Sequence, residues 1–281
     1  MKIIQHIEHL QEEISKAKDN NKSIGFVPTM GALHAGHLSL VKISKNENDI
    51  CVVSIFINPT QFNNKNDFTS YPRDIEKDCE LLRKFECDIV FTPDEKEMYP
   101  VPDTRKFDFS PLDKVMEGKY RPGHFNGVGQ IVSKLFDAVT PHKAYFGKKD
   151  YQQLAIIKKL AQDYNYPVEI IGCETQREPD GLAMSSRNML LTGKQRKEAP
   201  HIYKTLIKLK SKIGTTPVTE LKNWVKKEIN SSPELQLEYI EIADCKTLAP
   251  IEEYKKETPA VACIAVFANN VRLIDNVELN S

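Results

Sequence analysis

The feature that most restricts the fold of this chain is the alternation of strand-like and helix-like segments along its first 175 residues. Residues 50–57, ICVVSIFI, form an unbroken apolar run that ends at Asn58-Pro59, as expected of a strand buried on both faces. Alternation of such runs with helical segments is typical of a parallel sheet with helices on both faces. The predicted strands are 23–27, 50–57, 88–91, 144–146 and 168–171, and the predicted helices are 35–45, 74–85, 128–139 and 150–164, the last with Asp150 as its N-cap.

The pattern changes after residue 176. Two helices are predicted next, and each has a start signal: the capping box Thr192-x-x-Gln195 for the first, and Thr216 followed by Pro217 for the second. Three strand-like segments come after them, and the last two form a predicted hairpin: 237–242, 261–267 and 271–274. Helices followed by an antiparallel hairpin indicate a separate α+β lobe.

Together the two patterns predict an α/β fold in two domains. Residues 1–176 would form a Rossmann-like, doubly wound parallel sheet, and residues 177–281 would form a smaller α+β C-terminal domain. Ligand sites occur preferentially where two domains meet. We therefore expect the site in the cleft between the domains, with the smaller domain as its lid.

Charge and cysteine content argue against several classes of protein. Basic and acidic residues both number 39, so the chain lacks the basic excess of most duplex-binding proteins, and we expect no nucleic acid partner. The apolar runs are too short to span a membrane, and the N-terminus lacks a long apolar stretch, as expected of a cytoplasmic protein. The six cysteines lie mostly in apolar stretches and form no C-x-x-C pair, so we expect core residues rather than a disulfide framework or a zinc site.

The segment with the clearest chemical meaning is 28–38, PTMGALHAGHL, because it follows a predicted strand and begins a predicted helix. In a parallel sheet this position is the carboxyl edge, where ligands bind and a helix N-terminus attracts phosphate. Gly31 and Gly36 let the backbone approach an anion closely. The rings of His34 and His37 can donate N–H groups to phosphate oxygens.

Other interpretations of this segment are weaker. Its spacing nearly matches a P-loop, but His37 and Leu38 stand where that motif has Lys and Ser or Thr. A metal site on His34 and His37 has no third ligand nearby in the sequence, so no metal ligand is predicted. Two histidines without a function remain the plainest alternative.

Motifs further along the chain give a more specific indication. His-x-Gly-His after the first strand is the signature of the nucleotidyl-transferring α/β superfamily that includes the class I aminoacyl-tRNA synthetases. Taken with the later motifs, the chain resembles the pantoate–β-alanine ligase family, most closely from about residue 24 to residue 192. The later motifs are NPTQF at 58–62, YPRD at 71–74, RPGHF at 121–125, FGKKDYQQ at 146–153 and DGLAMSSRN at 180–188.

The resemblance implies an ATP-dependent ligase of pantothenate biosynthesis that works in two steps. The pantoate carboxylate attacks the α-phosphorus of ATP, giving pantoyl adenylate and pyrophosphate, and the β-alanine amine then attacks the acyl carbon, releasing AMP and pantothenate. ATP with Mg²⁺ is implied as a substrate rather than as a tightly bound cofactor. A homodimer with only small-molecule substrates as partners is also implied.

The resemblance places an ATP site on this sequence. His37 is the implied proton donor to the leaving pyrophosphate, with His34 and Lys149 as the other catalytic residues, while Asp150 would accept from the ribose hydroxyls. The loop 185–187 corresponds to a mobile phosphate-binding loop whose closure would protect the adenylate from water. The implied ATP-binding residues are Met30, Gly31, Ala32, Leu33, His34, Ala35, Gly36, His37, Gly147, Lys148, Lys149, Asp150, Gln176, Met184, Ser185, Ser186 and Arg187.

The pantoate site rests on amide side chains. Gln61 and Gln153 match the pantoate-binding glutamines of the family, Asn58 would support the same pocket, and Gln61 would also contact β-alanine. Amides suit this task because they bond both hydroxyls and carboxylate without adding charge. Three positions depart from the family pattern: Asn66 precedes Asp67 where Glu is common, Gln130 stands where Thr is frequent, and Gln176 replaces a usual Val in a segment whose backbone contacts adenine.

Arginine usage gives a further hint. Only eight of the 39 basic residues are arginine, and four of them lie in or beside the motifs, which favours anion recognition there: Arg73, Arg121, Arg177 and Arg187.

Two other functions remain open. A nucleotidyltransferase would leave a stable adenylylated product, and a nucleotide-binding module without catalysis would leave ATP intact.

Overall fold

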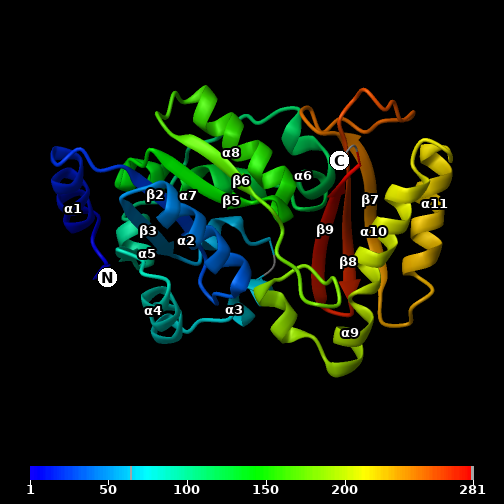
Figure 1. Ribbon diagram of the computed structural model, residues 1–281, viewed down its shortest axis with the longest axis horizontal. Coiled ribbons are helices and arrows are strands. Elements are labelled where there is room, and N and C mark those ends of the chain that lie inside the picture. Colours follow the sequence, from blue (N-terminus) through cyan, green and yellow to red (C-terminus); the bar gives the residue numbers. More distant parts are fainter. Residues whose placement is uncertain (64, 280–281) are drawn as a thin grey trace. The chain divides into compact units, whose positions relative to one another are not determined.

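The computed structural model describes residues 1–63 and 65–279, and the chain divides into two compact units (Figure 1). Unit 1 contains Met1–Phe109, Arg121–Lys148 and Gln153–Glu174, and unit 2 contains Ser110–Tyr120, Lys149–Gln152 and the chain from Thr175 onwards. The last segment of unit 2 thus begins next to the predicted boundary at residue 176. The two earlier segments of unit 2 are tied to each other because buried Gln152 donates from Nε2 to the carbonyls of Leu112 and Val115, at 2.6 and 2.9 Å.

Unit 1 is built on a parallel sheet of six strands in the order β1-β4-β3-β2-β5-β6. This confirms the predicted parallel sheet; only β1 was not expected, because three residues carry too short a pattern. Consecutive strands β2 and β3 are neighbours, whereas β5 pairs with the other side of β2. The strand order therefore reverses between β2 and β5, and ligands of such sheets bind beyond the carboxyl ends of the strands at that point. The strands are β1 (Lys2–Ile4), β2 (Ile24–Thr29), β3 (Ile50–Ile55), β4 (Ile89–Phe91), β5 (Lys143–Gly147) and β6 (Glu169–Cys173).

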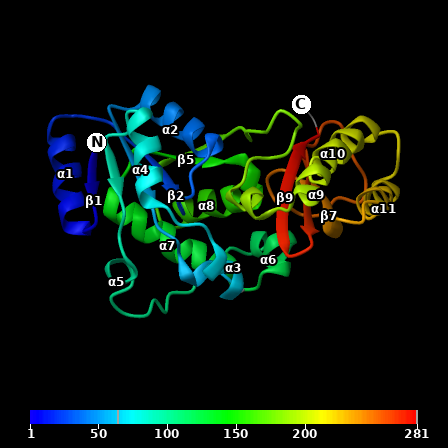
Figure 2. The same cartoon turned by 90° about the horizontal axis from the view of Figure 1, so that it is seen from below.

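Helices lie on both faces of this sheet. Figure 2 shows α2 and α4 on one side and α7 on the other. Under α2 and α4, alternate strand residues such as Val27, Val53 and Val90 pack against Leu38 and Leu82 in one buried cluster. The helices of this part of the chain are α1 (Ile7–Asp19), α2 (Ala35–Glu47), α3 (Lys65–Ser70), α4 (Ile75–Lys84), α5 (Glu95–Met98), α7 (His124–Val139) and α8 (Tyr151–Asp163), with 3-10 turns at η1 (Pro59–Gln61) and η3 (Lys148–Asp150).

Two helix starts differ from the prediction. Helix α7 begins at His124, four residues before the predicted start, because Gly123 takes a left-handed conformation with φ of 83° and turns the chain into the helix. Asp150 was expected to be the N-cap of the helix 150–164. It is instead the last residue of a 3-10 turn that leads directly into α8.

Unit 2 carries an antiparallel sheet of three strands in the order β7-β8-β9, which confirms the predicted hairpin. The apolar residues of α10 and α11, such as Leu206 and Leu221, share one buried cluster with β8 residues such as Ile264. The elements of unit 2 are η2 (Leu112–Lys114), α6 (Met116–Tyr120), η4 (Ser186–Leu190), α9 (Gly193–Glu198), α10 (His201–Lys212), α11 (Val218–Ile229), β7 (Gln236–Asp244), β8 (Ala260–Ala268) and β9 (Val271–Glu278).

The predicted helix starts of unit 2 are partly confirmed. Thr192 and Gln195 form the expected capping box, with the Gln195 N–H donating to Thr192 Oγ1 and the Thr192 N–H donating to Gln195 Oε1. The prediction of a single helix after this box is wrong, because Pro200 separates α9 from α10. Helix α11 starts one residue late, with Pro217 itself at the N-cap.

Five of the six cysteines are buried, which confirms the prediction that most of them are core residues: Cys51, Cys79, Cys87, Cys173 and Cys263. None of the helices in the described ranges has both the length and the apolar composition needed to cross a bilayer.

Candidate active site

Three neighbouring strands of unit 1 bring predicted site residues to one edge of the sheet. The segment Met30–His37 follows β2, Asn58 and Gln61 follow β3, and Gly147 with Lys148 ends β5. Because parallel strands end at the same edge, these three groups flank the point where the strand order reverses. Separate motifs of the sequence thus share one edge, and this geometry makes that edge the candidate active site of unit 1.

The backbone of the first segment is held by a carboxylate from outside the motif. Gly31 and Ala32 both have left-handed conformations, with φ of 80° and 49°. The N–H groups of Ala32 and Leu33 donate to the Asp78 carboxylate at 2.8 and 2.7 Å, and the Gly31 N–H donates to Thr29 Oγ1 at 3.2 Å. Asp78 is only 2% exposed. Burial raises the pKa of its carboxyl, and the two amide donors counteract part of that rise.

Asp78 is a residue of this site that the sequence analysis missed. The signal lies in the predicted helix 74–85, where Asp78 shares the buried face with Cys79 and Leu82. A carboxylate on the apolar side of an amphipathic helix needs a buried partner. Here that partner is the backbone of the segment after β2.

The two histidines cap helix α2 with their own rings. Gly36 donates its N–H to His34 Nδ1 at 3.1 Å, and His34 donates its N–H to His37 Nδ1 at 3.4 Å. A backbone N–H can only donate, so each Nδ1 accepts and the hydrogen of each neutral ring is on Nε2. The ring centroids are 4.1 Å apart. Nε2 is therefore the donor atom that each imidazole can offer a phosphate at this helix N-terminus.

Gln61 is held by its backbone as well as by its side chain. Its carbonyl lies 2.9 Å from His124 Nδ1 and accepts a hydrogen bond from Arg121 Nη2 at 3.3 Å. The turn that contains Gln61 packs directly on α7, where a Cβ at Gly127 would come within 2.5 Å of the Thr60 carbonyl oxygen. Arg121 and His124 of the motif 121–125 thus hold the backbone of Gln61 in position.

Gln153, the second glutamine predicted to bind pantoate, is next to Gln152, whose side chain bonds within the fold. Gln153 is half-buried in the first turn of α8. Its neighbour Gln152 is buried, and its Oε1 accepts the N–H of Glu117 at 2.9 Å. Of the two, only Gln153 is exposed enough to meet a substrate.

The predicted ATP-binding residues of unit 2 lie in η3 and in the chain from Gln176 to Arg187. The Lys149 carbonyl accepts a hydrogen bond from Asn276 Nδ2 at 2.9 Å, and its ammonium lies 3.9 Å from the Asp150 carboxylate. The neighbouring Lys148, in unit 1, pairs with Glu174 at 2.5 Å. Backbone and side chains of this short turn are thus already ordered by protein partners.

The chain from Gln176 to Arg187 forms a narrow hairpin with a turn behind it. Met184 donates its N–H to the Gln176 carbonyl at 3.0 Å, and Gly181 makes the reversal with φ of 95°. Ser185 then caps η4 by accepting the Arg187 N–H at 3.3 Å.

A buried ion pair fastens this hairpin to β9. Arg177 donates to both carboxylate oxygens of Asp275, at 2.7 and 2.9 Å, and its guanidinium stacks 3.6 Å above the centre of the Tyr203 ring. Burial raises the pKa of the Asp275 carboxyl despite this partner.

Three of the four arginines in or beside the motifs bond to groups of the chain itself. Arg177 pairs with Asp275, Arg121 donates to the Gln61 carbonyl, and Arg73 donates to the carbonyl of Phe68 at 3.0 Å. Anion recognition at the four arginines, Arg187 included, stays a prediction.

Known proteins share both the sequence and the fold of this chain. Residues 2–278 match the family model described as pantoate-beta-alanine ligase. The chain is 52% identical to the pantothenate synthetase of Bacteroides fragilis (strain YCH46) over 278 residues, or 99% of each chain. It is 47% identical to the pantothenate synthetase of Cytophaga hutchinsonii over 98% of each chain.

Solved structures agree with these relatives. The crystal structure of pantothenate synthetase from Thermus thermophilus matches with a TM-score of 0.93 and 39% identity, covering both chains completely. That of pantoate-beta-alanine ligase from Francisella tularensis, complexed with beta-gamma ATP and beta-alanine, matches with a TM-score of 0.83 and 37% identity over 100% of this chain and 98% of the other. The chain therefore belongs to the pantoate–β-alanine ligase family of pantothenate biosynthesis.

Proposed function

We propose that this ligase joins pantoate to β-alanine in two steps through a pantoyl adenylate, with ATP as the second substrate of the first step. The observation that carries the proposal is the shared sheet edge at which the segment Met30–His37 and Gln61 meet in a chain of this family. The Francisella tularensis relative, crystallised with an ATP compound and β-alanine, supports the same substrates.

The first step needs charge stabilisation on the leaving group. A pantoate carboxylate oxygen bonds to the α-phosphorus of ATP as the bond from that phosphorus to the pyrophosphate oxygen breaks. Negative charge grows on the pyrophosphate, and the N-terminus of α2 with the Nε2–H groups of His34 and His37 supplies donors for it. His37 is the proposed proton donor to pyrophosphate.

The remaining ATP contacts belong to residues held by neighbouring backbone or side chains. Lys149 would offset phosphate charge, Asp150 would accept from the ribose hydroxyls, and Gly147 and Lys148 would lie along the nucleotide. Mg²⁺ would come with the phosphates of ATP. The other proposed ATP-binding residues are Gln176, Met184, Ser185, Ser186 and Arg187, of which Arg187 offers forked donors to phosphate.

The second step needs two reactants held in line. The β-alanine amine bonds to the acyl carbon of the adenylate, AMP leaves with the electron pair of the broken acyl–phosphate bond, and the amine loses a proton. Gln61 and Gln153 would hold the pantoyl group, with Asn58 behind Gln61. Positioning of this kind supplies much of the rate in reactions without a covalent enzyme intermediate.

We also propose a homodimer formed through unit 1, which light scattering after gel filtration would test.

Exchange of labelled pyrophosphate into ATP tests the mechanism. With Mg²⁺ and pantoate present and β-alanine absent, we expect pantoate-dependent exchange, because the adenylate forms reversibly before the amine arrives. AMP release on adding β-alanine without prior exchange would keep the ligase but contradict a freely reversible adenylate step. Neither exchange nor AMP would contradict the ligase itself, and a stable adenylylated product would favour a nucleotidyltransferase.

A further inference from the structure

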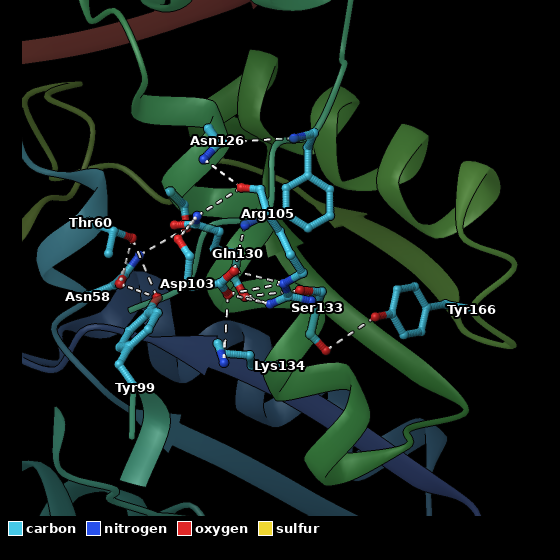
Figure 3. Close-up of polar contacts among 12 residues, drawn as sticks. Asn58, Thr60, Tyr99, Asp103, Arg105, Asn126, Gln130, Ser133, Lys134 and Tyr166 are labelled. Atoms are coloured by element: carbon cyan, nitrogen blue, oxygen red, sulfur yellow. Dashed lines mark hydrogen bonds and ion pairs between the residues drawn. The ribbon is translucent and has the colours of Figure 1, made fainter. Parts of the chain in front are cut away.

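Asn58 bonds to the Gln61 side chain and is the centre of a set of hydrogen bonds, of which Figure 3 shows those with Thr60 and Tyr99. Its side chain is 1% exposed. Its Nδ2 donates to the Gly127 carbonyl and to Gln61 Oε1, both at 3.1 Å. Its Oδ1 accepts from the Tyr99 hydroxyl at 2.7 Å and from the Thr60 hydroxyl at 3.1 Å.

The chemistry of these partners leaves one orientation for the Asn58 amide. A backbone carbonyl can only accept, so the atom that faces Gly127 must be the nitrogen. Both hydrogens of that nitrogen are then used, one on Gly127 and one on Gln61. The oxygen faces Tyr99 and Thr60, whose hydroxyl groups can both donate.

The orientation of Asn58 decides that of Gln61. The atom of Gln61 that accepts from Asn58 must be its oxygen, because the amide nitrogen has no acceptor lone pair to offer. Gln61 Nε2 is therefore turned to the opposite side, where it lies 3.3 Å from Met30 Sδ in the segment after β2. A thioether sulfur is only a weak acceptor, so this N–H contact is easily exchanged for a better one.

We propose that Tyr99 is a positioning residue: together with the Gly127 carbonyl, its hydroxyl holds the Asn58 amide in one orientation, and Asn58 in turn holds the Gln61 amide so that Gln61 meets pantoate as a hydrogen-bond donor. The inference rests on the proposed role of Gln61 in binding pantoate. An oxygen of the substrate replaces the Met30 sulfur as the acceptor. The subsite then selects an acid whose carboxylate or hydroxyl oxygen can accept at that point.

Tyr99 is itself firmly placed. It follows helix α5, and its ring lies 6.3 Å from the Phe56 ring, with the Lys134 ammonium 5.2 Å from its own ring centre. Burial raises the pKa of Tyr99 to about 12. The hydroxyl thus keeps its proton and remains a donor throughout the neutral pH range.

The charged side chains near Tyr99 pair with one another. The Asp103 carboxylate accepts from Arg105 Nη2 at 2.6 Å and lies 3.7 Å from the Lys134 ammonium. Gln130 Nε2 donates to the carbonyls of Asp103 and Arg105, at 2.9 and 3.0 Å. The departure from the family's frequent Thr at 130 is explained here, since a longer amide reaches both carbonyls and holds the chain after Tyr99 in place.

The test compares two tyrosines that differ in what their hydroxyls reach. Tyr166 is the matched control: burial also raises its pKa to about 12, but its hydroxyl donates to the Ser133 carbonyl, at 3.4 Å (Figure 3). In pyrophosphate exchange, we expect Tyr99→Phe to raise the KM for pantoate roughly 10-fold, the effect of one lost hydrogen bond, with the KM for ATP changed less than about twofold. Tyr166→Phe is expected to change neither KM.

Several outcomes would overturn the proposal. A pantoate KM unchanged in Tyr99→Phe would do so, and so would an equal rise in both KM values, which indicates general damage. Failure of the proposed function would look different, because the unmodified enzyme would then show no pantoate-dependent exchange at all. If Tyr99→Phe does not fold, Thr60→Val removes the other hydroxyl donor and should shift the pantoate KM in the same direction by a smaller factor.

A double-mutant cycle shows whether Tyr99 acts through Asn58. In an Asn58→Ala background the relay is already broken, so adding Tyr99→Phe should change the pantoate KM by less than about twofold. Independent effects that multiply would contradict an action through Asn58.

Discussion

The two segments proposed to meet the phosphates of ATP are held in different ways. The segment Met30–His37 is fastened by its own backbone: two of its N–H groups donate to the buried Asp78 carboxylate, and two more end on the rings that cap α2. The segment from Gln176 to Arg187 is a hairpin fastened at its base by the Arg177–Asp275 ion pair.

The two segments should therefore respond differently when a residue that holds them is substituted. A left-handed alanine such as Ala32 costs roughly 1 kcal/mol or more, and the Asp78 carboxylate stabilises it in that conformation. Loss of Asp78 would therefore change the backbone that carries the histidines. Loss of the Arg177 pair would loosen the base of a hairpin whose proposed ligand contacts lie several residues away. We expect larger effects on catalysis in the first segment than in the second.

The largest effect is expected at His37. His37→Ala removes the Nε2–H donor proposed for the leaving pyrophosphate and should lower the rate of adenylation roughly 10²–10³-fold. It also removes one half of the cap of α2, which should cost about 1 kcal/mol of unfolding free energy. Single-turnover formation of pantoyl adenylate measures the rate, and urea unfolding measures the stability. Ser39→Ala, two residues further along the same helix, is the control. An unchanged adenylation rate would remove His37 from the mechanism.

A smaller effect is expected at Asp78, which touches no substrate in this proposal. Asn offers a single acceptor oxygen, so in Asp78→Asn the new amide nitrogen would face one of the two backbone N–H groups. We expect a loss of roughly 1–3 kcal/mol in stability and, because a displacement of about 1 Å is expensive in catalysis, roughly 10²-fold in adenylation rate.

The control for Asp78 lies on the same helix. Asp74 caps α4 by accepting the Lys77 N–H at 3.0 Å, and Asn caps as well as Asp. Asp74→Asn should leave both stability and rate nearly unchanged. If Asp78→Asn loses stability but keeps its adenylation rate, Asp78 has no positioning role, and the contrast between the two segments fails.

The hairpin of unit 2 should respond more weakly. Lys cannot make the forked contact of Arg177 with Asp275 nor stack on Tyr203 in the same way. Arg177→Lys should raise the KM for ATP roughly 10-fold, which corresponds to about 1.4 kcal/mol, with little change in the adenylation rate at saturating ATP.

Arg272 provides the matched control in unit 2. It lies on β9, as Asp275 does, and donates to both oxygens of Glu117 at 2.8 and 2.7 Å. Arg272→Lys should lower the melting temperature without raising the KM for ATP. Equal rises in the two variants would mean that the KM reports only the stability of unit 2.

The regular elements were the easiest to predict from the sequence. The strand at 50–57 is an apolar, β-branched run bounded by Asn-Pro, and the capping box at Thr192 is a local signal; both were confirmed apart from small shifts at the ends. The membership of Ser110–Tyr120 in unit 2 could not be predicted, because it depends on contacts with distant residues. Glu117, for example, accepts from the Tyr239 hydroxyl and from Arg272.

The candidate site shows the same limit. Motif residues such as His37 and Gln61 were identifiable because the motifs carry them. Asp78 and Tyr99 were not, since each acts through another residue and lies about 40 positions away from the group it orients. Only the fold brings these pairs together, and the hydrophobic periodicity of the sequence does not predict contacts between residues so far apart.

The smallest expected effect is on the pH dependence of stability. It compares a buried carboxylate held by amides with one held by a cation. Asp103 in unit 1 is the second kind: hydrogen bonds from Arg105 lower the pKa of its carboxyl to about 2. A folded-state pKa below the unfolded value of about 3.9 stabilises the protein above pH 4, and this contribution is lost as the pH falls towards 2. Burial raises the pKa of Asp78 instead, so its contribution is fully present below pH 4 and is lost as the pH rises through the folded-state pKa.

The two aspartates should therefore give opposite slopes. Urea unfolding between pH 3 and pH 7 would compare the parent enzyme with Asp103→Asn and with Asp78→Asn. The stability lost in Asp103→Asn should grow as the pH rises from 3 to 5, because only the ionised carboxylate gains from Arg105. The stability lost in Asp78→Asn should shrink as the pH rises, because the parent must then ionise a desolvated carboxyl whose donors, the N–H groups of Ala32 and Leu33, are neutral amides. If the stability losses of the two variants changed with pH in the same direction, amide donors would hold a buried charge as well as a guanidinium does. The expected difference between a segment held by amides and one held by an ion pair would then disappear.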